Sequence, residues 1–366
     1  MSTIEFVLGF CAPAVIYGLV LILHLLLPAS EVEGYVTNPD TNLPYSYRLN
    51  GLTILVVTTA IWAAIGWLGW LPWDWFYQHR WSSLTGACAL GLAYTAILVF
   101  NAPSGGKPLI AELFLGRVEN MQYAGRVDAK MYLYMAGAIM LMLNALAAGA
   151  HHHVLFGSAA NPGVWLYLLL LSFFLLDYLW FERVHLYTYD LFAERLGFKL
   201  AWGCLVFYPF FYPIGLWGTA HLGTPSTIEK AQWFWLVGSA GVFFLGWSLA
   251  RGANMQKYLF KRFPDRPFLG RLAPEAITDG KQQVLSNGFW GVARHINYLG
   301  EILMATGLAL SLGHIASPWP WLYPLYYIAL LVPRQRDDDR RCAAKYGALW
   351  DEYRAKVPYR IIPRVY

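Results

Sequence analysis

Long apolar stretches are the feature that most restricts the fold of this chain. Of its 366 residues, 57% are hydrophobic and only 13% are charged, whereas about a quarter of the residues in ordinary soluble domains are charged. A run of about 17 or more apolar residues can cross the hydrocarbon core of a bilayer as a helix. We find such runs at 4–28, 52–73, 83–101, 131–149, 163–181, 200–219, 232–250, 300–316 and 317–333. We therefore predict an all-α integral membrane protein with about nine or ten transmembrane helices, whose last two short spans form either a tight hairpin or a partly re-entrant pair.

The polar residues between these runs give the expected domain organisation. The longest polar interval is only the loop that follows Ala250, so we predict one membrane domain over residues 1–366. Residues 1–100 are expected to be a helical scaffold, 102–250 to line a ligand pocket, and 251–366 to carry most of the chemistry. The first apolar run is too long for a cleaved signal peptide and lacks a basic start, so it is expected to remain in the mature protein.

Basic residues are concentrated in the last third of the chain. Eight Lys or Arg lie in 251–299 and nine in 334–366, which is seventeen of the 27 in the sequence. The positive-inside rule places both segments on the cytoplasmic side. Nucleic-acid binding is not expected, because acidic residues accompany the basic ones and membrane spans adjoin them. Binding to lipid head groups would explain cations at an interface, but it gives no reason for Trp290, Asn297 and Tyr298 to stand among them.

Cysteine and histidine give no sign of a metal centre. Cys11, Cys88, Cys204 and Cys342 have no metal-ligand spacing, and we expect neither disulfides nor a bound metal. The cluster at 151–153 contains three adjacent histidines, whose side chains point in different directions from one backbone.

Two carboxylates at the edge of the fifth apolar run are candidate functional residues. Asp177 and Glu182 follow a run of leucines and phenylalanines, and a charge inside or at the rim of a span costs about 2.5–3.5 kcal/mol. Asp190, further along, is interpreted as a solvated rim residue. We expect Asp177 and Glu182 to line a pocket.

The segment 251–366 combines cations, amides and aromatic rings at helical spacing. Asn254, Lys257 and Lys261 are three and four residues apart, and so are placed on one helix face. Such an arrangement can bind phosphates through Lys and Arg while an aromatic ring stacks on a flat ligand. No G-x-G-x-x-G turn follows a strand-like segment, so a dinucleotide site would have to be built between helices. The other residues assigned to this group are Trp290, Arg294, His295, Asn297, Tyr298, Arg334, Asp338, Cys342, Tyr346 and Tyr353.

Four strings in this segment resemble the sterol reductases, a family that includes the Δ14- and Δ7-sterol reductases and the reductase-like domain of the lamin B receptor. They are RGANMQK, GFWGVARHINYLGE, the block RDDD with its later Cys and KYG, and VPYRIIPRVY. Weaker similarity extends back through FFLLDYLWFE to GRVENMQ. The resemblance implies an NADPH-dependent reductase of a sterol carbon–carbon double bond with about ten helical spans. Carried over by position, the NADPH contacts are Lys257, Lys261, Leu285, Trp290, Asn297, Tyr298, Arg334, Asp338, Cys342, Tyr346 and Tyr353.

The chain departs from the family pattern at several places. Lys261 stands where the family usually has Arg, which keeps the charge but loses the bidentate fork. The family's Arg-Asp pair reads Asp337-Asp338, and Pro333 replaces a polar residue. Of the earlier G-x-x-x-N-P-R motif only Gly116 and Asn120 survive. These changes leave cofactor use largely unaffected, but they leave open which double bond is reduced. The spacing from Gly116 to Asp128 and Lys130 gives a slight lean to Δ7 over Δ14, and reduction of a side-chain Δ24 bond is a further alternative.

The implied reaction requires an acid. An isolated ring double bond accepts a proton first, and hydride then quenches the carbocation, so a buried and protonated carboxyl group is expected. We favour Asp338 for proton delivery, with Asp177 and Glu182 as pocket residues, while the family's proposed tyrosine has no clear counterpart. The alternatives are a membrane methyltransferase resembling isoprenylcysteine carboxyl methyltransferase and a non-catalytic sterol-binding protein. The expected location is the endoplasmic reticulum in a eukaryote or the inner membrane in a bacterium, with the NADPH site facing the cytoplasm. The expected partners are the sterol substrate and membrane lipid. The oligomeric state is left open.

Overall fold

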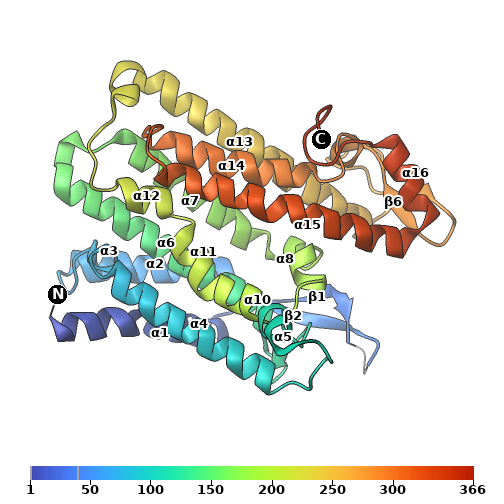
Figure 1. Cartoon of the computed structure of the whole chain (residues 1–366), viewed down its shortest axis with the longest axis horizontal. Coiled ribbons are helices and arrows are strands. Elements are labelled where there is room, and N and C mark those ends of the chain that lie inside the picture. Colours follow the sequence, from blue (N-terminus) through green and yellow to red (C-terminus); the bar gives the residue numbers. More distant parts are fainter. Residues whose placement is uncertain (1, 39–40) are drawn as a thin grey trace. The chain divides into compact units, whose positions relative to one another are not determined.

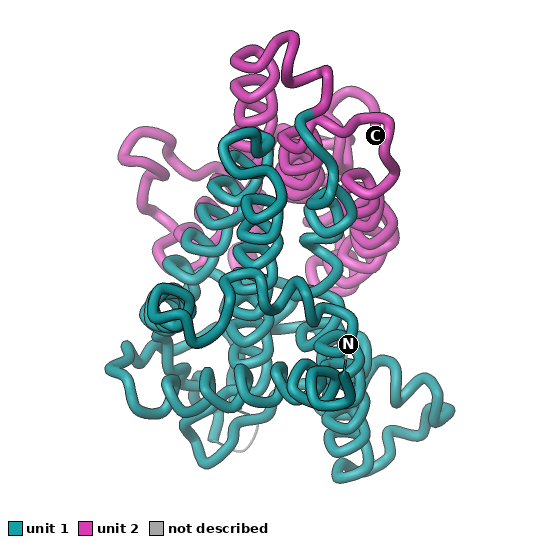
Figure 2. The backbone as a smooth tube through the Cα atoms, turned by 90° about the vertical axis from the view of Figure 1, so that its left-hand side faces the viewer, with its two compact units in different colours: residues 1–224 teal, residues 225–366 magenta. Residues whose placement is uncertain are grey.

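The computed structural model describes residues 2–38 and 41–366 and is mostly helical (Figure 1). Contacts within the chain divide it into two compact units, residues 1–224 and 225–366, which Figure 2 colours teal and magenta. Helices occur at all nine places where apolar runs were found in the sequence. The prediction of a helical membrane protein is therefore confirmed.

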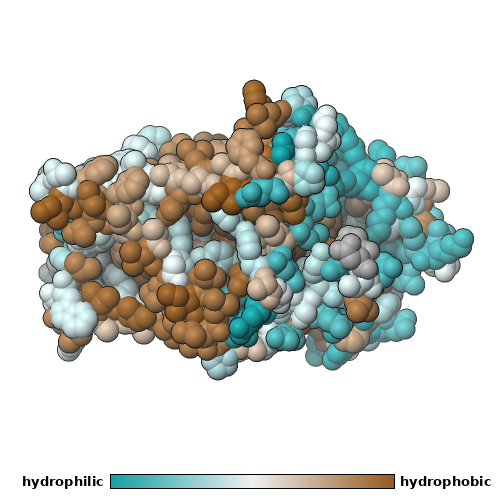
Figure 3. Space-filling model, turned by 90° about the horizontal axis from the view of Figure 1, so that it is seen from below, coloured by the Kyte–Doolittle hydropathy of each residue, from teal (hydrophilic) through white to brown (hydrophobic). Residues whose placement is uncertain are grey.

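Six helical segments of the described chain are long and apolar enough to cross a membrane. Of the other three predicted spans, α2 (Gly51–Trp67) and α14 (Ile296–Ser311) are shorter, and α15 (Leu322–Tyr346) carries charged residues in its second half. Figure 3 views the molecule from the side on which α1 and α4 lie in Figure 1, and hydrophobic residues gather toward one end of that face while hydrophilic residues gather toward the other. The six segments are Thr3–Leu26, Arg80–Phe100, Ala129–Ala159, Pro162–Trp180, Phe198–Thr219 and Ser226–Arg262.

The N-terminal unit is built around α6 (Ala129–Phe156), which contacts α1, α2, α3, α7, α11 and α12. Asp128 directly precedes this helix, and its side chain caps the N-terminus by accepting a hydrogen bond from the backbone amide of Met131 at 3.0 Å. Lys130 is almost fully buried, and its ammonium donates to the carbonyl oxygen of Leu191 at 2.8 Å. Asp128 and Lys130 therefore fix where α6 starts.

The other elements of this unit surround α6. The bounds of these elements are α1 (Thr3–Leu26), β1 (Ser30–Thr37), β2 (Pro44–Leu49), α2 (Gly51–Trp67), α3 (Trp75–Gln78), α4 (Arg80–Phe100), α5 (Leu109–Leu115), β3 (Gln122–Tyr123), β4 (Val127–Asp128), η1 (Gly157–Ala159), α7 (Pro162–Trp180), α8 (Glu182–His185), α9 (Tyr189–Phe192), α10 (Phe198–Trp202), η2 (Gly203–Phe207), α11 (Tyr208–Phe211) and α12 (Ile214–Thr219).

The antiparallel hairpin β1–β2 was not expected from the sequence. Ser30 pairs with Leu49 and Glu33 with Ser46, and Tyr47 is the strand residue that becomes buried. Arg48 ties the hairpin to the end of α1, because its guanidinium donates to the carbonyl oxygen of Leu27 at 2.6 Å. The polar composition of this segment gave no strand periodicity strong enough to separate it from a loop.

The adjacent histidines at 151–153 have different partners. Nδ1 of His151 lies 2.9 Å from a carboxylate oxygen of Asp74. His152 instead contacts the carbonyl oxygen of Ala220 through Nδ1 at 2.8 Å and accepts a hydrogen bond from the amide of Asn161. The two rings therefore point in different directions, as expected for neighbouring positions on a helix.

The C-terminal unit consists mainly of three helices that run side by side in Figure 1, with α14 in contact with both others. The helix α13 (Ser226–Arg262) has a non-helical residue at Ala231. The remaining elements are β5 (Ala276–Thr278), β6 (Gln283–Leu285), η3 (Gly288–Gly291), α14 (Ile296–Ser311), η4 (Trp319–Trp321), α15 (Leu322–Tyr346) and α16 (Ala348–Lys356).

Two glycines allow α13 and α14 to approach closely. A Cβ atom added to Gly300 would lie 2.5 Å from the amide nitrogen of Ala250 and 2.5 Å from the carbonyl oxygen of Gly246. Close packing through small residues is typical of helices in membranes, where apolar burial alone does not drive helix association. The glycine pair therefore fixes the alignment of the two helices that carry much of the predicted nucleotide site.

We expect Gly300→Val to lower the thermal midpoint of the protein in detergent, because the backbone atoms that the new side chain meets cannot move aside. Overpacking of this kind costs about 1–3 kcal/mol or more. Gly241→Val on α13 is the control, since nothing lies within 4 Å of a Cβ atom added there. Equal midpoints for the two variants would show that the close approach at Gly300 does not matter for stability.

Candidate functional site

The polar end of α13 lies against the segment that follows β6. The indole nitrogen of Trp290 donates to the carbonyl oxygen of Ala253 at 2.9 Å, and Nζ of Lys257 lies 5.3 Å from the centre of the same indole. The amide of Asn297 donates to Oδ1 of Asn254 at 3.4 Å. Four residues that the sequence assigned to one group are therefore neighbours: Asn254, Lys257, Trp290 and Asn297.

Gln256 holds this contact in place, although the sequence analysis did not single it out. Its side chain is buried, donates to the carbonyl oxygen of Asn287 at 3.2 Å and accepts from the amide of Phe289 at 3.0 Å. A buried amide with both ends satisfied favours one conformation of the segment 287–290. Its position one residue before Lys257 did not indicate this role, because Gln also occurs on helix faces that are exposed to water.

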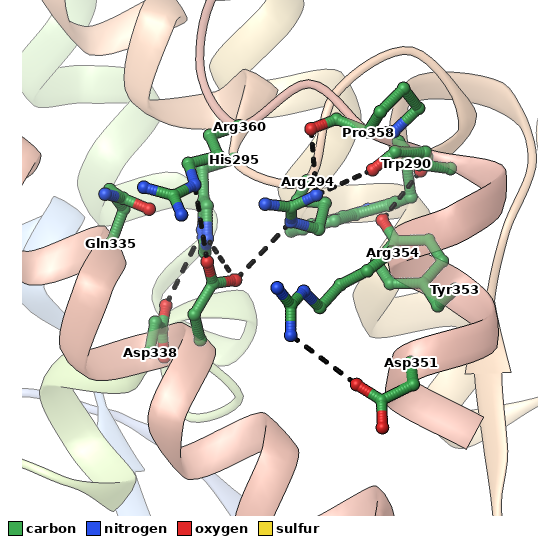
Figure 4. A network of polar contacts seen from close by, with 12 residues as sticks. Trp290, Arg294, His295, Gln335, Asp338, Asp351, Tyr353, Arg354, Pro358 and Arg360 are labelled. Atoms are coloured by element: carbon green, nitrogen blue, oxygen red, sulfur yellow. Dashed lines mark hydrogen bonds and ion pairs between the residues drawn. The ribbon is translucent and has the colours of Figure 1, made fainter. Parts of the chain in front are cut away.

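Asp338 on α15 joins this region through α14. The hydroxyl group of Tyr298 donates to Oδ2 of Asp338 at 3.0 Å, and the ring of His295 stacks on the Tyr298 ring with 5.2 Å between centres. Nδ1 of His295 also lies 3.9 Å from Asp338, as Figure 4 shows. Arg334 lies one helical turn earlier on α15 and is partly buried.

Asp339 is the centre of a group of ion pairs that the sequence did not predict. Its carboxylate lies 3.5 Å from Nε of Arg294, 3.5 Å from Nε2 of His295 and 3.8 Å from Nε of Arg360. Burial alone would raise the pKa of Asp339, but the hydrogen bond and charge of His295 together with both arginines hold that pKa below its ordinary value. Asp339 is therefore ionised at neutral pH.

The remaining predicted residues lie around α16. Cys342 and Tyr346 pack against a buried cluster that includes Trp350 and Tyr353. The hydroxyl group of Tyr353 donates to the carbonyl oxygen of Trp290 at 2.7 Å, which links α16 to η3. Leu285, at the end of β6, is buried.

Burial and the nearby aspartates raise the pKa of Cys342 to about 11, so its thiol is neutral at physiological pH. A neutral thiol makes van der Waals contact with a ligand and is a poor nucleophile. Lys261 completes the group, since it lies within electrostatic range of Lys257, Cys342 and Asp338.

The two other acidic candidates belong to the N-terminal unit. Glu182 is 7% exposed, and its Oε2 accepts a hydrogen bond from the amide of Gly51, the first residue of α2, at 3.1 Å. Burial raises the pKa of Glu182 to about 7, although the Gly51 hydrogen bond opposes this. Asp177 is partly buried in the last turn of α7. The sequence did not indicate the contact between Glu182 and Gly51.

The arrangement in the C-terminal unit suits a nucleotide chemically. Cations on one helix face, an indole and buried amides offer contacts for phosphates, a flat ring and polar ring substituents. Asn297 also indicates a ligand-binding site. Its buried Oδ1 has no hydrogen-bond partner among the described residues and can accept a hydrogen bond from a ligand.

Comparisons with known proteins show which family the chain matches. A family model described as the ergosterol biosynthesis ERG4/ERG24 family matches residues 8–366. A protein named Delta(14)-sterol reductase from Arabidopsis thaliana is 33% identical over 356 residues, covering 93% of this chain and 91% of the relative. The protein of that name from Methylotuvimicrobium alcaliphilum is 31% identical, covering 94% and 80%. A mouse Delta(14)-sterol reductase is 32% identical, covering 95% and 83%.

Proposed function

Because the chain belongs to the ergosterol biosynthesis ERG4/ERG24 family, we propose that it reduces the Δ14 double bond of a sterol with NADPH as the hydride donor. The relatives described above carry the name Delta(14)-sterol reductase, so we propose Δ14 in place of the slight lean to Δ7 drawn from the spacing between Gly116 and Lys130. The observation that carries the proposal is the cluster of Lys257, Trp290 and Asn297, since neither sterol binding alone nor a methyl donor without phosphates needs these groups together.

In this proposal the cofactor is held by the C-terminal unit. Lys257 and Lys261 would bind phosphate oxygens, Trp290 would contact a ring, and the free Oδ1 of Asn297 would accept a hydrogen bond. Cys342, Tyr346 and Tyr353 would form the wall on the side of α15 and α16, with Leu285, Tyr298, Arg334 and Asp338 as the remaining contacts. When bound, NADPH supplies the hydride.

The proton is proposed to come from Asp338. Its Oδ2 accepts the Tyr298 hydroxyl hydrogen, which leaves Oδ1 to carry the acid proton. The Tyr298 hydroxyl also fixes the direction of the carboxyl group, and a fixed acid is more effective in proton transfer than a mobile one. Glu182 is the second candidate, because a carboxyl group with a pKa of about 7 remains partly protonated at neutral pH. Asp177 is the third.

Expression in a yeast strain deprived of its own Δ14 reductase tests the reaction. We expect mass spectrometry of the sterols to show that Δ8,14-dienols disappear and 14-reduced sterols accumulate. The same profile separates the other outcomes, because Δ7 or Δ24 reduction gives products of different retention. An unchanged profile, with the protein present in membranes, would contradict the proposed reductase activity and favour sterol binding alone.

We expect Trp290→Ala to weaken NADPH binding, because the indole both contacts the cofactor and lies beside Lys257. Loss of an aromatic stacking partner costs about 1–3 kcal/mol. The dissociation constant is measured by titration of the detergent-solubilised protein, and Trp290→Phe should lose less because a ring remains. Trp319→Ala, an exposed tryptophan in the same unit, is the control. An unchanged dissociation constant for Trp290→Ala would mean that Trp290 only anchors the segment.

A further inference from the structure

A polar cavity that is largely open to solvent lies in the C-terminal unit and is not part of the predicted nucleotide site. It has a volume of about 440 Å³ and none of Lys257, Lys261, Trp290 or Asn297 lines it. Figure 4 shows Arg354 extending from α16 toward Arg294. The lining residues are Arg294, Asp351, Arg354, Ala355, Pro358 and Arg360.

The three arginines of this cavity have hydrogen-bond donors to spare. Nη1 of Arg294 donates to the carbonyl oxygens of Val357 and Pro358 at 2.8 and 3.0 Å, whereas its buried Nε has no hydrogen-bond partner among the described residues. Nη1 of Arg354 lies 3.5 Å from Oδ1 of Asp351. Strong charge-assisted hydrogen bonds between guanidinium and carboxylate groups are about 2.7–2.9 Å long. The ion pairs of 3.5 Å and more around this cavity therefore leave N–H groups for a ligand.

The charges around the cavity favour an anion. Three guanidinium groups line it against the single carboxylate of Asp351, which is largely exposed. Asp339 also pairs with Arg294 and Arg360, but His295 shares that carboxylate. An anion in the cavity would therefore meet a net positive charge.

The number and position of the donors point to phosphate. A guanidinium group matches the oxygens of a phosphate or carboxylate in two parallel hydrogen bonds. A carboxylate has two oxygens and can satisfy one such group fully, whereas a phosphate monoester has three terminal oxygens for three arginines. We propose that Arg294, Arg354 and Arg360 form a binding site for a phosphate monoester group, distinct from the residues that are proposed to hold the cofactor ring and the reacting groups.

Arg354 and Asp351 provide variants with opposite expected effects. Arg294 is unsuitable, because it holds the segment 357–358 and its loss would disturb the fold. Arg354→Gln should raise the dissociation constant for inorganic phosphate about tenfold, since one charged hydrogen-bond donor is lost. Asp351→Asn should lower it by roughly two- to fivefold, because a neighbouring negative charge is removed. A purely structural role of the pair would not change the affinity in opposite directions.

Inorganic phosphate is the first probe, titrated against the full-length protein in a detergent with a neutral head group, with chloride added to keep the ionic strength constant. Binding is followed by the thermal midpoint, which a ligand of the native state raises. Arg341→Gln is the control, because Arg341 is exposed and pairs with Asp337 outside the cavity. A phosphate effect that is absent from the unmodified protein, or equal in Arg354→Gln and in the control, would overturn the proposal.

Two further titrations identify the source of the phosphate. If it belongs to the nucleotide, Arg354→Gln weakens binding of NADPH but not of NADH. If it belongs to a membrane lipid, short-chain phosphatidic acid displaces inorganic phosphate, short-chain phosphatidylcholine does not, and the variant retains its affinity for both nucleotides. If neither holds while inorganic phosphate still binds through Arg354, the ligand is a soluble phosphate monoester other than the cofactor. These outcomes do not depend on reductase activity. The phosphate site can therefore be refuted while the proposed reaction stands, and the reaction can be refuted while the phosphate site stands.

Discussion

Asp338→Asn is expected to reduce sterol turnover by about 100-fold, the size typical of a lost general acid. The amide has nearly the same shape as the carboxyl group, and its oxygen can still accept the hydrogen bond from the Tyr298 hydroxyl. It cannot release a proton as an acid. The dissociation constant for NADPH should change little, since neighbouring contacts remain. Single-turnover rates in detergent and NADPH titrations measure the two quantities separately.

The neighbouring aspartate on the same helix supplies the control for this experiment. Asp337 is about half exposed and pairs with Arg341 one turn along α15, so Asp337→Asn should leave both turnover and binding near their original values. If Asp338→Asn binds NADPH normally and reduces sterol at the original rate, Asp338 is not the acid. Glu182 and Asp177 then become the residues to replace.

Glu182→Gln is expected to stabilise the protein at alkaline pH and to leave its stability at acidic pH nearly unchanged. Burial raises the pKa of Glu182 from 4.5 to about 7 in the folded state, so the native protein binds the proton more tightly than the unfolded chain. The contribution of Glu182 to the free energy of unfolding is therefore fully present below about pH 4.5 and is lost as the pH rises through 7. Above pH 8 the loss amounts to about 3 kcal/mol. In the variant, the amide oxygen of Gln can still accept the hydrogen bond from Gly51.

Thermal midpoints of the two proteins in detergent at pH 5 and pH 8 measure this effect. Glu119→Gln is the control, because Glu119 is half exposed and pairs with the exposed Arg195. Parallel pH profiles for Glu182→Gln and the unmodified protein would contradict a raised pKa. In that case Glu182 would be ionised at neutral pH, and its place as the second candidate for proton delivery would be lost.

The sequence predicted the helices well because the physical constraint on them is strong. A chain inside lipid must satisfy its own backbone hydrogen bonds, so each apolar run had only one available structure. Helical spacing likewise placed Lys257 and Lys261 on one face, and the aromatic residues threaded among cations indicated that Trp290 belonged with them. The proximity of Lys257 to the indole of Trp290 agrees with this grouping.

The run Asp337-Asp338-Asp339 shows where the sequence stops being informative. Successive residues on a helix point about 100° apart, so each of the three carboxylates has different neighbours. Asp337 pairs with Arg341, Asp338 accepts from Tyr298, and Asp339 binds Arg294 and Arg360. Only Arg341 lies on the same helix, whereas Tyr298, Arg294 and Arg360 come from other segments of the chain. Three identical side chains in a row do not indicate which of them meets which partner. The cavity at Arg354 was missed for the same reason.

The pairing of residues 294–295 with 359–360 affects the order in which the protein can mature. The amides of Arg294 and His295 donate to the carbonyl oxygens of Tyr359 and Arg360 at 3.0 and 2.7 Å, and Tyr353 binds the Trp290 carbonyl group. A growing polypeptide places its apolar helices in the bilayer before these late residues leave the ribosome. Membrane insertion and assembly of the proposed cofactor pocket are therefore separate events in biosynthesis, and a prematurely terminated chain would be inserted without this pocket.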